Sequence, residues 1–211
     1  KTPILVGDCA GFIVNRILLP YLNEAAFILE QGSKIEKIDN LIKDFGMPMG
    51  PFTLADTVGV DVGYKVACIL NEAYGNRMPI ASIIEKMYDA KLFGAKTEAG
   101  FYEYAGRDIY PNAHVTSMLE NNNKIIEDEE IVQRCIYIMI NEASRCLEEN
   151  IVTDASIIDF AMISGTGFPA YKGGLLSYAN EIGLKNILES LRKFEKEFGS
   201  RFTPSNLLVK L

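Results

Sequence analysis

The chain has 211 residues, 48% of them hydrophobic, and a net charge of −7 at neutral pH. The negative charge and the lack of a basic stripe exclude a nucleic-acid-binding surface, and no apolar run reaches the ~20 residues that a membrane-spanning helix needs. Each half of the chain is long enough to bury a core of its own. The cysteines lack metal-site spacing and indicate reduced, mostly buried thiols: Cys9, Cys68, Cys135 and Cys146.

Apolar residues recur at helical spacing through the first hundred residues. Pro20 should kink the first helix, and Ser33 with Glu36 forms a capping box that opens the second. Helices are predicted from about Gly11 to Glu30, from Ser33 to just before Gly46, from Pro51 past Asp56, from Asp61 to near Gly75, and from Pro79 to about Lys91. The aromatic segment 101–104 is predicted to be extended.

Residues 105–124 are typical of a connector, because Gly106, Pro111 and the asparagines 121–123 interrupt any apolar stripe. A second helical block follows, and its acidic start at 127–130 suits the N-terminus of a helix. Helices are predicted from there to about Asn150, after a cap at Thr153 and Asp154, after Gly173 and Gly174, after Gly183, and from Thr203 to Ser205 onward.

The two helical blocks repeat each other. Residues 14–16 (Val-Asn-Arg) correspond to 132–134 (Val-Gln-Arg), and Asn-Glu-Ala at 23–25 recurs at 141–143, at an offset of about 118 residues. Short solenoid repeats have periods of about 20–50 residues, so the longer period predicts a duplicated domain.

The repeat suggests domain boundaries and an asymmetry. We predict a first copy over 1–105, a connector over 106–124 and a second, degenerate copy over 125–211. Asn15 of the first copy corresponds to Gln133 of the second, which suggests one working copy and one supporting copy.

Two patterns that resemble functional sites are weak. Gly165 to Ala170 fits the G-x-G-x-x-A pattern of dinucleotide-binding loops, but it follows a helical stretch and Pro169 interrupts the helix that should come next. It also corresponds to the loop at 46–51 in the first copy. His114, the single histidine, lies in the connector, so neither a zinc site nor a histidine-based triad can be assembled.

Two features remain as candidate site residues. The amide of Asn15 is both a donor and an acceptor, so it could hold a carbonyl, orient an imidazole, or be a structural amide. A rigid loop rich in Pro, Gly and Met could line an apolar groove or simply connect two helices on the core. Its residues are Met47, Pro48, Met49, Gly50, Pro51 and Phe52.

Several segments carry a resemblance to a known family. Residues 7–16 resemble the G-x-x-x-G-F-[IV]-x-N-R segment of L-3-hydroxyacyl-CoA dehydrogenases, 45–61 are similar to that family's next signature, and 92–102 match the end of its first helical domain. Residues 141–149 and 167–174 resemble the second helical domain of multifunctional β-oxidation α-subunits. The resemblance implies an all-α fold of two tandem helical domains packed as an internal pseudo-dimer, like the C-terminal part of 6-phosphogluconate dehydrogenase.

The resemblance also implies roles for residues. Asn15 matches an active-site asparagine that helps hold the 3-oxygen of the substrate beside a catalytic histidine, the loop 47–52 becomes part of the acyl-CoA cleft, and Gln133 is non-catalytic. The family oxidises 3-hydroxyacyl-CoA to 3-oxoacyl-CoA with NAD, which is bound by a domain that this chain lacks, so the chain alone should be inactive. The sequence departs from the family at Glu98 and Ala99, where Gly-Lys is usual.

The partners implied by the resemblance are an acyl-CoA substrate and the protein's own N-terminal NAD-binding domain. A hydratase domain and a thiolase subunit are left open, and no nucleic acid or metal is implied. The implied location is a bacterial cytoplasm or, alternatively, a mitochondrial matrix. The competing interpretation is a non-catalytic helical module for dimerisation or assembly.

Overall fold

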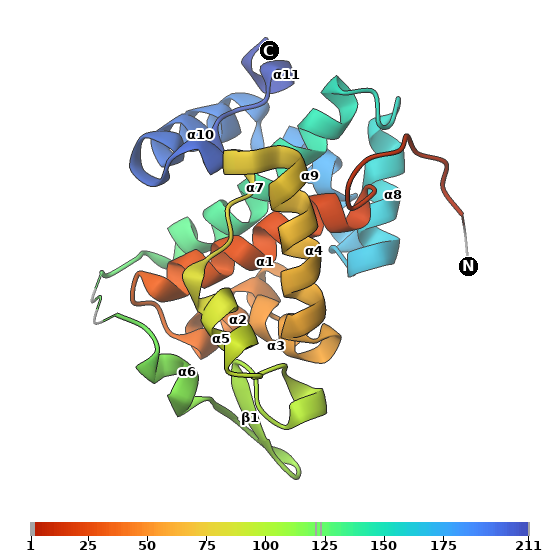
Figure 1. Ribbon diagram of the computed structural model, residues 1–211. Helices are drawn as coiled ribbons and strands as arrows, with labels where there is room; N and C mark the ends of the chain where they lie inside the picture. Colours follow the sequence, from red (N-terminus) through yellow and green to blue (C-terminus); the bar gives the residue numbers. More distant parts are fainter. Residues whose placement is uncertain (1–2, 121, 123, 211) are drawn as a thin grey trace. The chain divides into compact units, whose positions relative to one another are not determined.

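The computed structural model describes residues 3–120, 122 and 124–210, which are helical apart from one small sheet (Figure 1). The all-α prediction is therefore confirmed. The first half contains α1 (Val14–Glu30), α2 (Ile35–Phe45), α3 (Pro51–Val58), α4 (Val60–Tyr74), η1 (Gly75–Arg77), α5 (Ser82–Asp89) and η2 (Ala95–Thr97). The second half contains α7 (Asp128–Glu148), α8 (Ala155–Thr166), η3 (Ala170–Lys172), α9 (Leu175–Ile182), α10 (Leu184–Phe198), η4 (Ser200–Phe202) and α11 (Asn206–Val209).

The predicted connector contains secondary structure that the sequence did not predict. The extended segment at 101–104 is strand β1 (Tyr102–Ala105), and it pairs antiparallel with β2 (Asp108–Pro111), which is followed by the short helix α6 (Ala113–Ser117). Asn121 and Asn123, two of the three asparagines used to predict the connector, lie outside the described residues.

The chain divides into two compact units, and neither coincides with one predicted copy of the repeat. Unit 1 comprises Lys1–Pro20, Ile69–Pro79 and Ile136–Leu211, and unit 2 comprises Tyr21–Cys68 and Ile80–Cys135. Unit 1 therefore combines most of the second copy with the start of the first copy and its residues 69–79, and unit 2 combines most of the first copy with the connector and the start of the second copy. The boundaries of the two sequence copies, at 1–105 and 125–211, describe which residues repeat each other and not which residues pack together, so they stay a prediction.

Helix α1 ends in a backbone motif that displaces the predicted start of α2. The N–H of Gly32 donates to the carbonyl of Leu29, and the N–H of Ser33 donates to that of Ile28, which is the Schellman pattern of a helix C-terminus. Ser33 therefore closes α1, and the N-cap of α2 is Lys34 without a side-chain cap bond. The predicted capping box is wrong, because the residue needed as its cap already ends the preceding helix.

In unit 2 a buried carboxylate holds the start of α3. Asp39 accepts the backbone N–H groups of Phe52 at 2.8 Å and Thr53 at 3.0 Å, and the hydroxyl of Thr53 at 2.7 Å. Gly50 is required beside it, because a Cβ there would lie 2.2 Å from the Asp39 Cγ. Phe52 is thereby placed in the core, where its ring lies 4.4 Å from that of Phe101.

Unit 1 repeats this arrangement with residues of the second copy. Asp159 accepts the N–H of Leu176 at 2.6 Å and the hydroxyl of Ser177 at 2.6 Å, and so holds the start of α9. A Cβ at Gly174 would lie 2.4 Å from the Asp159 Cβ. Asp159 thus plays the part in unit 1 that Asp39 plays in unit 2.

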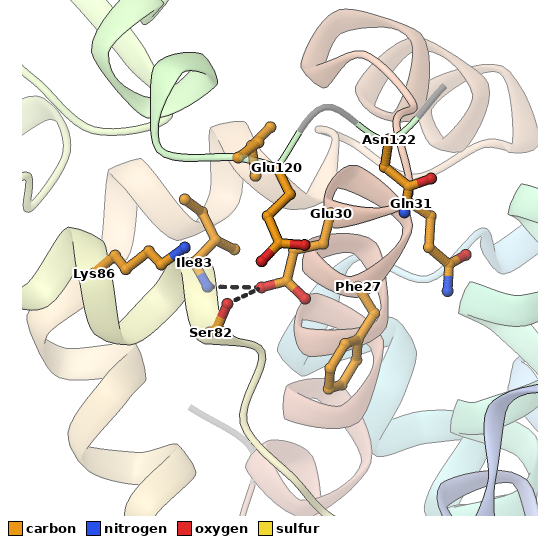
Figure 2. Close-up of a pocket in the computed structure, with 9 residues that line it drawn as sticks. Phe27, Glu30, Gln31, Ser82, Ile83, Lys86, Glu120 and Asn122 are labelled. Carbon is orange, nitrogen blue, oxygen red and sulfur yellow. Dashed lines mark hydrogen bonds between the residues drawn. The ribbon is translucent and has the colours of Figure 1, made fainter. Parts of the chain in front are cut away.

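A second capping contact also recurs. In unit 2, Glu30 accepts the N–H of Ile83 at 2.7 Å and the hydroxyl of Ser82 at 2.9 Å, so the end of α1 caps the start of α5 (Figure 2). In unit 1, Glu148 accepts the N–H of Asn206 at 2.9 Å and caps α11. Negative charge at a helix N-terminus is stabilising, and the repeated glutamates explain why both short helices form.

Candidate functional site

Asn15 is the second residue of α1, in unit 1, and its side chain is exposed. It makes no hydrogen bond to any residue that the structure describes. The preceding turn has positive φ at Gly11 (77°) and at Phe12 (49°), a conformation that costs free energy for a residue with a bulky side chain. Phe12 is 63% exposed. The free amide therefore stands at a helix start that is reached through a strained turn.

The next residue, Arg16, is fully buried and tightly bound. Its Nε donates to Glu142 at 2.7 Å and its Nη2 to Glu149 at 2.7 Å, and its guanidinium lies 4.7 Å from the centre of the Tyr74 ring. Burial, the largest single effect, would lower the pKa of Arg16, but Glu142, Cys146 and Glu149 together outweigh it and the pKa lies above its usual value. Arg16 is thus a permanent cation held by two carboxylates.

Arg77 and Tyr74 make further contacts around the Arg16 guanidinium. Arg77 covers the same Tyr74 ring at 4.5 Å and approaches both Glu142 and Glu149 at 3.3 Å. The Tyr74 hydroxyl donates to the carbonyl of Ala10 at 3.2 Å, and burial raises the pKa of Tyr74 to about 12. We use the name Arg16 cluster for Arg16, Tyr74, Arg77, Glu142 and Glu149.

The equivalent position of the second copy is different. The Gln133 amide donates to Glu129, one turn earlier in α7, at 2.8 Å. The following residue, Arg134, is fully buried and donates to Glu24 at 2.8 Å and to Gln31 at 2.8 Å. The repeated arginines therefore both serve structure, whereas the two amides differ because only that of Asn15 is free.

The loop 47–52 lies in unit 2 and is mostly core. Met47 is 4% exposed and Phe52 1% exposed, and Gly50 and Pro51 are also buried. Pro48 is exposed and Met49 is half-buried, so only these two side chains are available to a ligand. The structure thus brings the six loop residues together at the start of α3. Asn15 belongs to the other unit.

Comparison of the sequence with known protein families identifies the kind of domain that carries these features. The 3-hydroxyacyl-CoA dehydrogenase C-terminal domain matches the chain twice, over residues 11–104 and again over 131–211. The chain belongs to this family.

The curated relatives of this dehydrogenase family are longer than the chain. It is 41% identical over 212 residues to a fatty acid oxidation complex subunit alpha from Vibrio cholerae, with 99% of the chain aligned. It is 42% identical over 216 residues to the protein of that name from Idiomarina loihiensis, with all of the chain aligned. The chain spans only about 30% of the length of either relative.

Two solved structures of dehydrogenases share the fold over the whole chain. The 3-hydroxybutyryl-CoA dehydrogenase from Escherichia coli aligns with a TM-score of 0.81 at 22% identity, over 61% of its own length. The dehydrogenase part of multifunctional enzyme 1 from Caenorhabditis elegans aligns with a TM-score of 0.73 at 29% identity, over 50% of its length.

In this dehydrogenase domain the glycine-rich string 165–170 does not fit a nucleotide site. Gly167 is the C-cap of α8 with φ of 73°. A dinucleotide fingerprint needs the opposite polarity, because the pyrophosphate binds to backbone N–H groups at a helix N-terminus. A helix C-terminus carries the negative end of the dipole. His114 lies exposed on α6.

Asp56, which the sequence predicted only as part of a helix, holds the hairpin of unit 2. It accepts the N–H groups of Phe101 and Tyr102 at 2.9 Å each and the Tyr104 hydroxyl at 3.1 Å. Burial raises the pKa of Asp56 to about 6, although these donors act in the opposite direction. The two glycines of the 94–100 segment leave room for it, since a Cβ at Gly100 would lie 2.1 Å from the Asp56 Oδ1.

A cavity of about 340 Å³ in unit 2 is lined in part by the side chains in Figure 2, with Phe27, Lys86 and Glu120 around the capping residue Glu30. The Glu30, Ser82 and Ile83 groups that line this cavity bond to one another and cap the start of α5, so we assign its polar lining to the capping of that helix. Among the described residues, no group of three or more His, Cys, Asp or Glu side chains could hold a metal ion. Nor does any helix of the described ranges have the length and apolar character needed to cross a membrane.

Proposed function

We propose that this chain supplies the substrate side of an NAD-dependent L-3-hydroxyacyl-CoA dehydrogenase of fatty-acid β-oxidation. The observation that carries the proposal is the free amide of Asn15. Four other polar residues of the repeated helices are bonded inside the protein: Arg16, Glu24, Glu142 and Arg134. The exposed Asn15 amide is left to bond with solvent or with a ligand, and the motif that it shares with a dehydrogenase family favours a ligand.

In the proposed reaction the Asn15 amide donates a hydrogen bond to the 3-oxygen of the acyl chain. This bond fixes the oxygen while a base outside this chain takes the hydroxyl proton and a hydride leaves C3, the carbon that bears the oxygen. Such a donor acts mainly by orientation. Pro48 and Met49 would contact the apolar part of the acyl-CoA, since they are the accessible residues of their loop. NAD accepts the hydride, and the string at 165–170 does not fit it, so we assign its binding to another domain.

Further features of the whole protein follow from the same proposal. The repeat and the two separate family matches support duplicated domains over 1–105 and 125–211. The relatives are longer than this chain and are named subunit alpha of a fatty acid oxidation complex, which supports further domains in the same protein and a further subunit. We assign NAD binding to one of these domains, and a hydratase domain and a thiolase subunit are the further partners that the family resemblance leaves open. These named relatives are bacterial, which supports the cytoplasm as the location.

The test uses the complete product of the gene that encodes this chain. NADH formation from 3-hydroxybutyryl-CoA is followed at 340 nm for the wild type, Asn15→Ala and the matched control Gln133→Ala. Loss of one oriented donor should lower kcat about 100-fold for Asn15→Ala, whereas Gln133→Ala should stay within about twofold of wild type. A wild-type protein without this activity, or an Asn15→Ala variant that is folded and fully active, would refute the proposal and favour a helical assembly module.

A further inference from the structure

We propose that Arg16 is a positioning residue for Asn15, and that the second copy of the repeat takes part in the site by supplying the carboxylates that hold Arg16. This inference rests on the proposed role of Asn15. All residues concerned lie within unit 1. It gives the degenerate copy a function other than filling space.

The first step concerns the helix start. The first turn of a helix lacks the full set of backbone bonds, and the strained turn at Gly11 and Phe12 gives it little support of its own. An external anchor is needed if the Asn15 amide is to keep one orientation. Arg16 is that anchor, because its buried fork is bonded at 2.7 Å to each of Glu142 and Glu149.

The second step concerns the chain on the other side of Asn15. Tyr74 donates to the carbonyl of Ala10 at 3.2 Å, and its ring carries the Arg16 guanidinium at 4.7 Å. Residues 10 and 16 are thus tied to one cluster, and Asn15 lies between them. Planar stacking and fork geometry are properties of arginine that lysine does not share.

The third step is the comparison between the two copies. Arg134 follows Gln133 as Arg16 follows Asn15, but the place of Glu149 is taken in unit 2 by the neutral Gln31. Arg16 is held by Glu142 and Glu149. Arg134 is held by Glu24 through both Nε and Nη2, by Gln31, and by Glu130 at 3.6 Å. Both arginines are thus firmly held and the copies differ in the amide beside the arginine, which makes Arg134 a matched control for Arg16.

The experiment is a double-mutant cycle in the complete gene product, with the second copy as its control. Arg16→Lys keeps the charge but cannot bond both carboxylates. It should lower kcat about 10-fold, because small misplacements of a positioning group are costly, and leave the KM for NAD unchanged. Arg134→Lys makes the same chemical change and should leave kcat within about twofold. Thermal unfolding of each variant separates loss of fold from loss of rate.

The cycle with Asn15→Ala decides the mechanism. If Arg16 acts through Asn15, Arg16→Lys should change kcat by less than about twofold in the Asn15→Ala background, because interacting residues are not additive. Additive losses, or an equal loss for Arg134→Lys, would overturn the inference while leaving the role of Asn15 intact. A fully active Asn15→Ala protein would instead overturn the proposed function.

A second variant keeps the test decisive if Arg16→Lys does not fold. Glu149 is 38% exposed, so Glu149→Gln perturbs the fold little and replaces this carboxylate with the amide that Gln31 supplies in unit 2. We expect kcat to fall about threefold in the wild-type background and not at all in the Asn15→Ala background. An unchanged kcat in the wild-type background would overturn the inference.

Discussion

Removing the Asp39 carboxylate should cause one of the largest losses of stability available from a single polar side chain of unit 2. Asp39 is 3% exposed, and Asp39→Ala leaves two buried donors without an acceptor, the N–H of Phe52 and the hydroxyl of Tyr102. Each costs about 1–3 kcal/mol. Loss of the cap on α3 adds about 1 kcal/mol, so we expect a total of about 3–7 kcal/mol.

The matched variant is Asp159→Ala in unit 1. It leaves one fully buried donor, the N–H of Leu176, because the donors of Ser177 are only partly buried. The same reasoning gives about 2–4 kcal/mol. The prediction is therefore an order, with Asp39→Ala more destabilising than Asp159→Ala.

The assay is urea unfolding of the chain, followed by circular dichroism and by tyrosine fluorescence, because the sequence has no tryptophan. Coincident transitions and an unchanged m-value show that the free energies of unfolding are comparable. A loss below 1 kcal/mol for Asp39→Ala, or a loss for Asp159→Ala that equals or exceeds it, would refute the counting of buried donors.

Three further outcomes are expected. Gly50→Ala should destabilise the chain by at least about 3 kcal/mol in the same assay, because its Cβ would overlap Asp39; a smaller loss would mean that α3 moves aside freely. Because the pKa of Asp56 is raised from 3.8 to about 6, its contribution to the free energy of unfolding is present below about pH 4 and is lost, by up to about 3 kcal/mol, as the pH rises through about 6. Urea unfolding at several pH values should show this loss in the wild type and not in Asp56→Asn, and the same dependence of the unfolding free energy on pH in both proteins would contradict it. Burial raises the pKa of the Cys146 thiol to about 12, and Cys135 is fully buried, so iodoacetamide should label the half-buried Cys9 and Cys68 first, as peptide mass spectrometry can check.

Helix starts that depend on nearby side chains could be predicted from the sequence. Asp154 accepts from Ser156 two residues later, and Ser205 accepts from Leu208 three residues later, so each cap is contained in a short string. Pro51 likewise begins α3 as predicted. Ser33 could not be assigned from its string alone, because the end of α1 and the start of α2 compete for it.

The hairpin and most of the site depend on contacts between distant residues. The strands β1 and β2 have four residues each and are held by Asp56, which lies 45 residues before Phe101. The repeat and the family resemblance pointed to Asn15, but neither shows that its amide is free. The roles of Arg16 and Glu142 were also hidden, since 126 residues separate them, although the repeat had marked both motifs.

The pairing of Arg16 with Glu142 has a consequence for synthesis of the protein on the ribosome. The ribosome adds about 5–20 residues per second, and 126 residues separate Arg16 from Glu142. The Glu142 carboxylate is therefore synthesised roughly 6–25 s after Arg16. Unit 2 draws only on residues up to Cys135, whereas unit 1 needs residues up to Leu211. The segment that carries Asn15 is therefore made before its partners and ordered only after them, and the candidate site should be among the last parts of the two units to acquire protection from proteolysis.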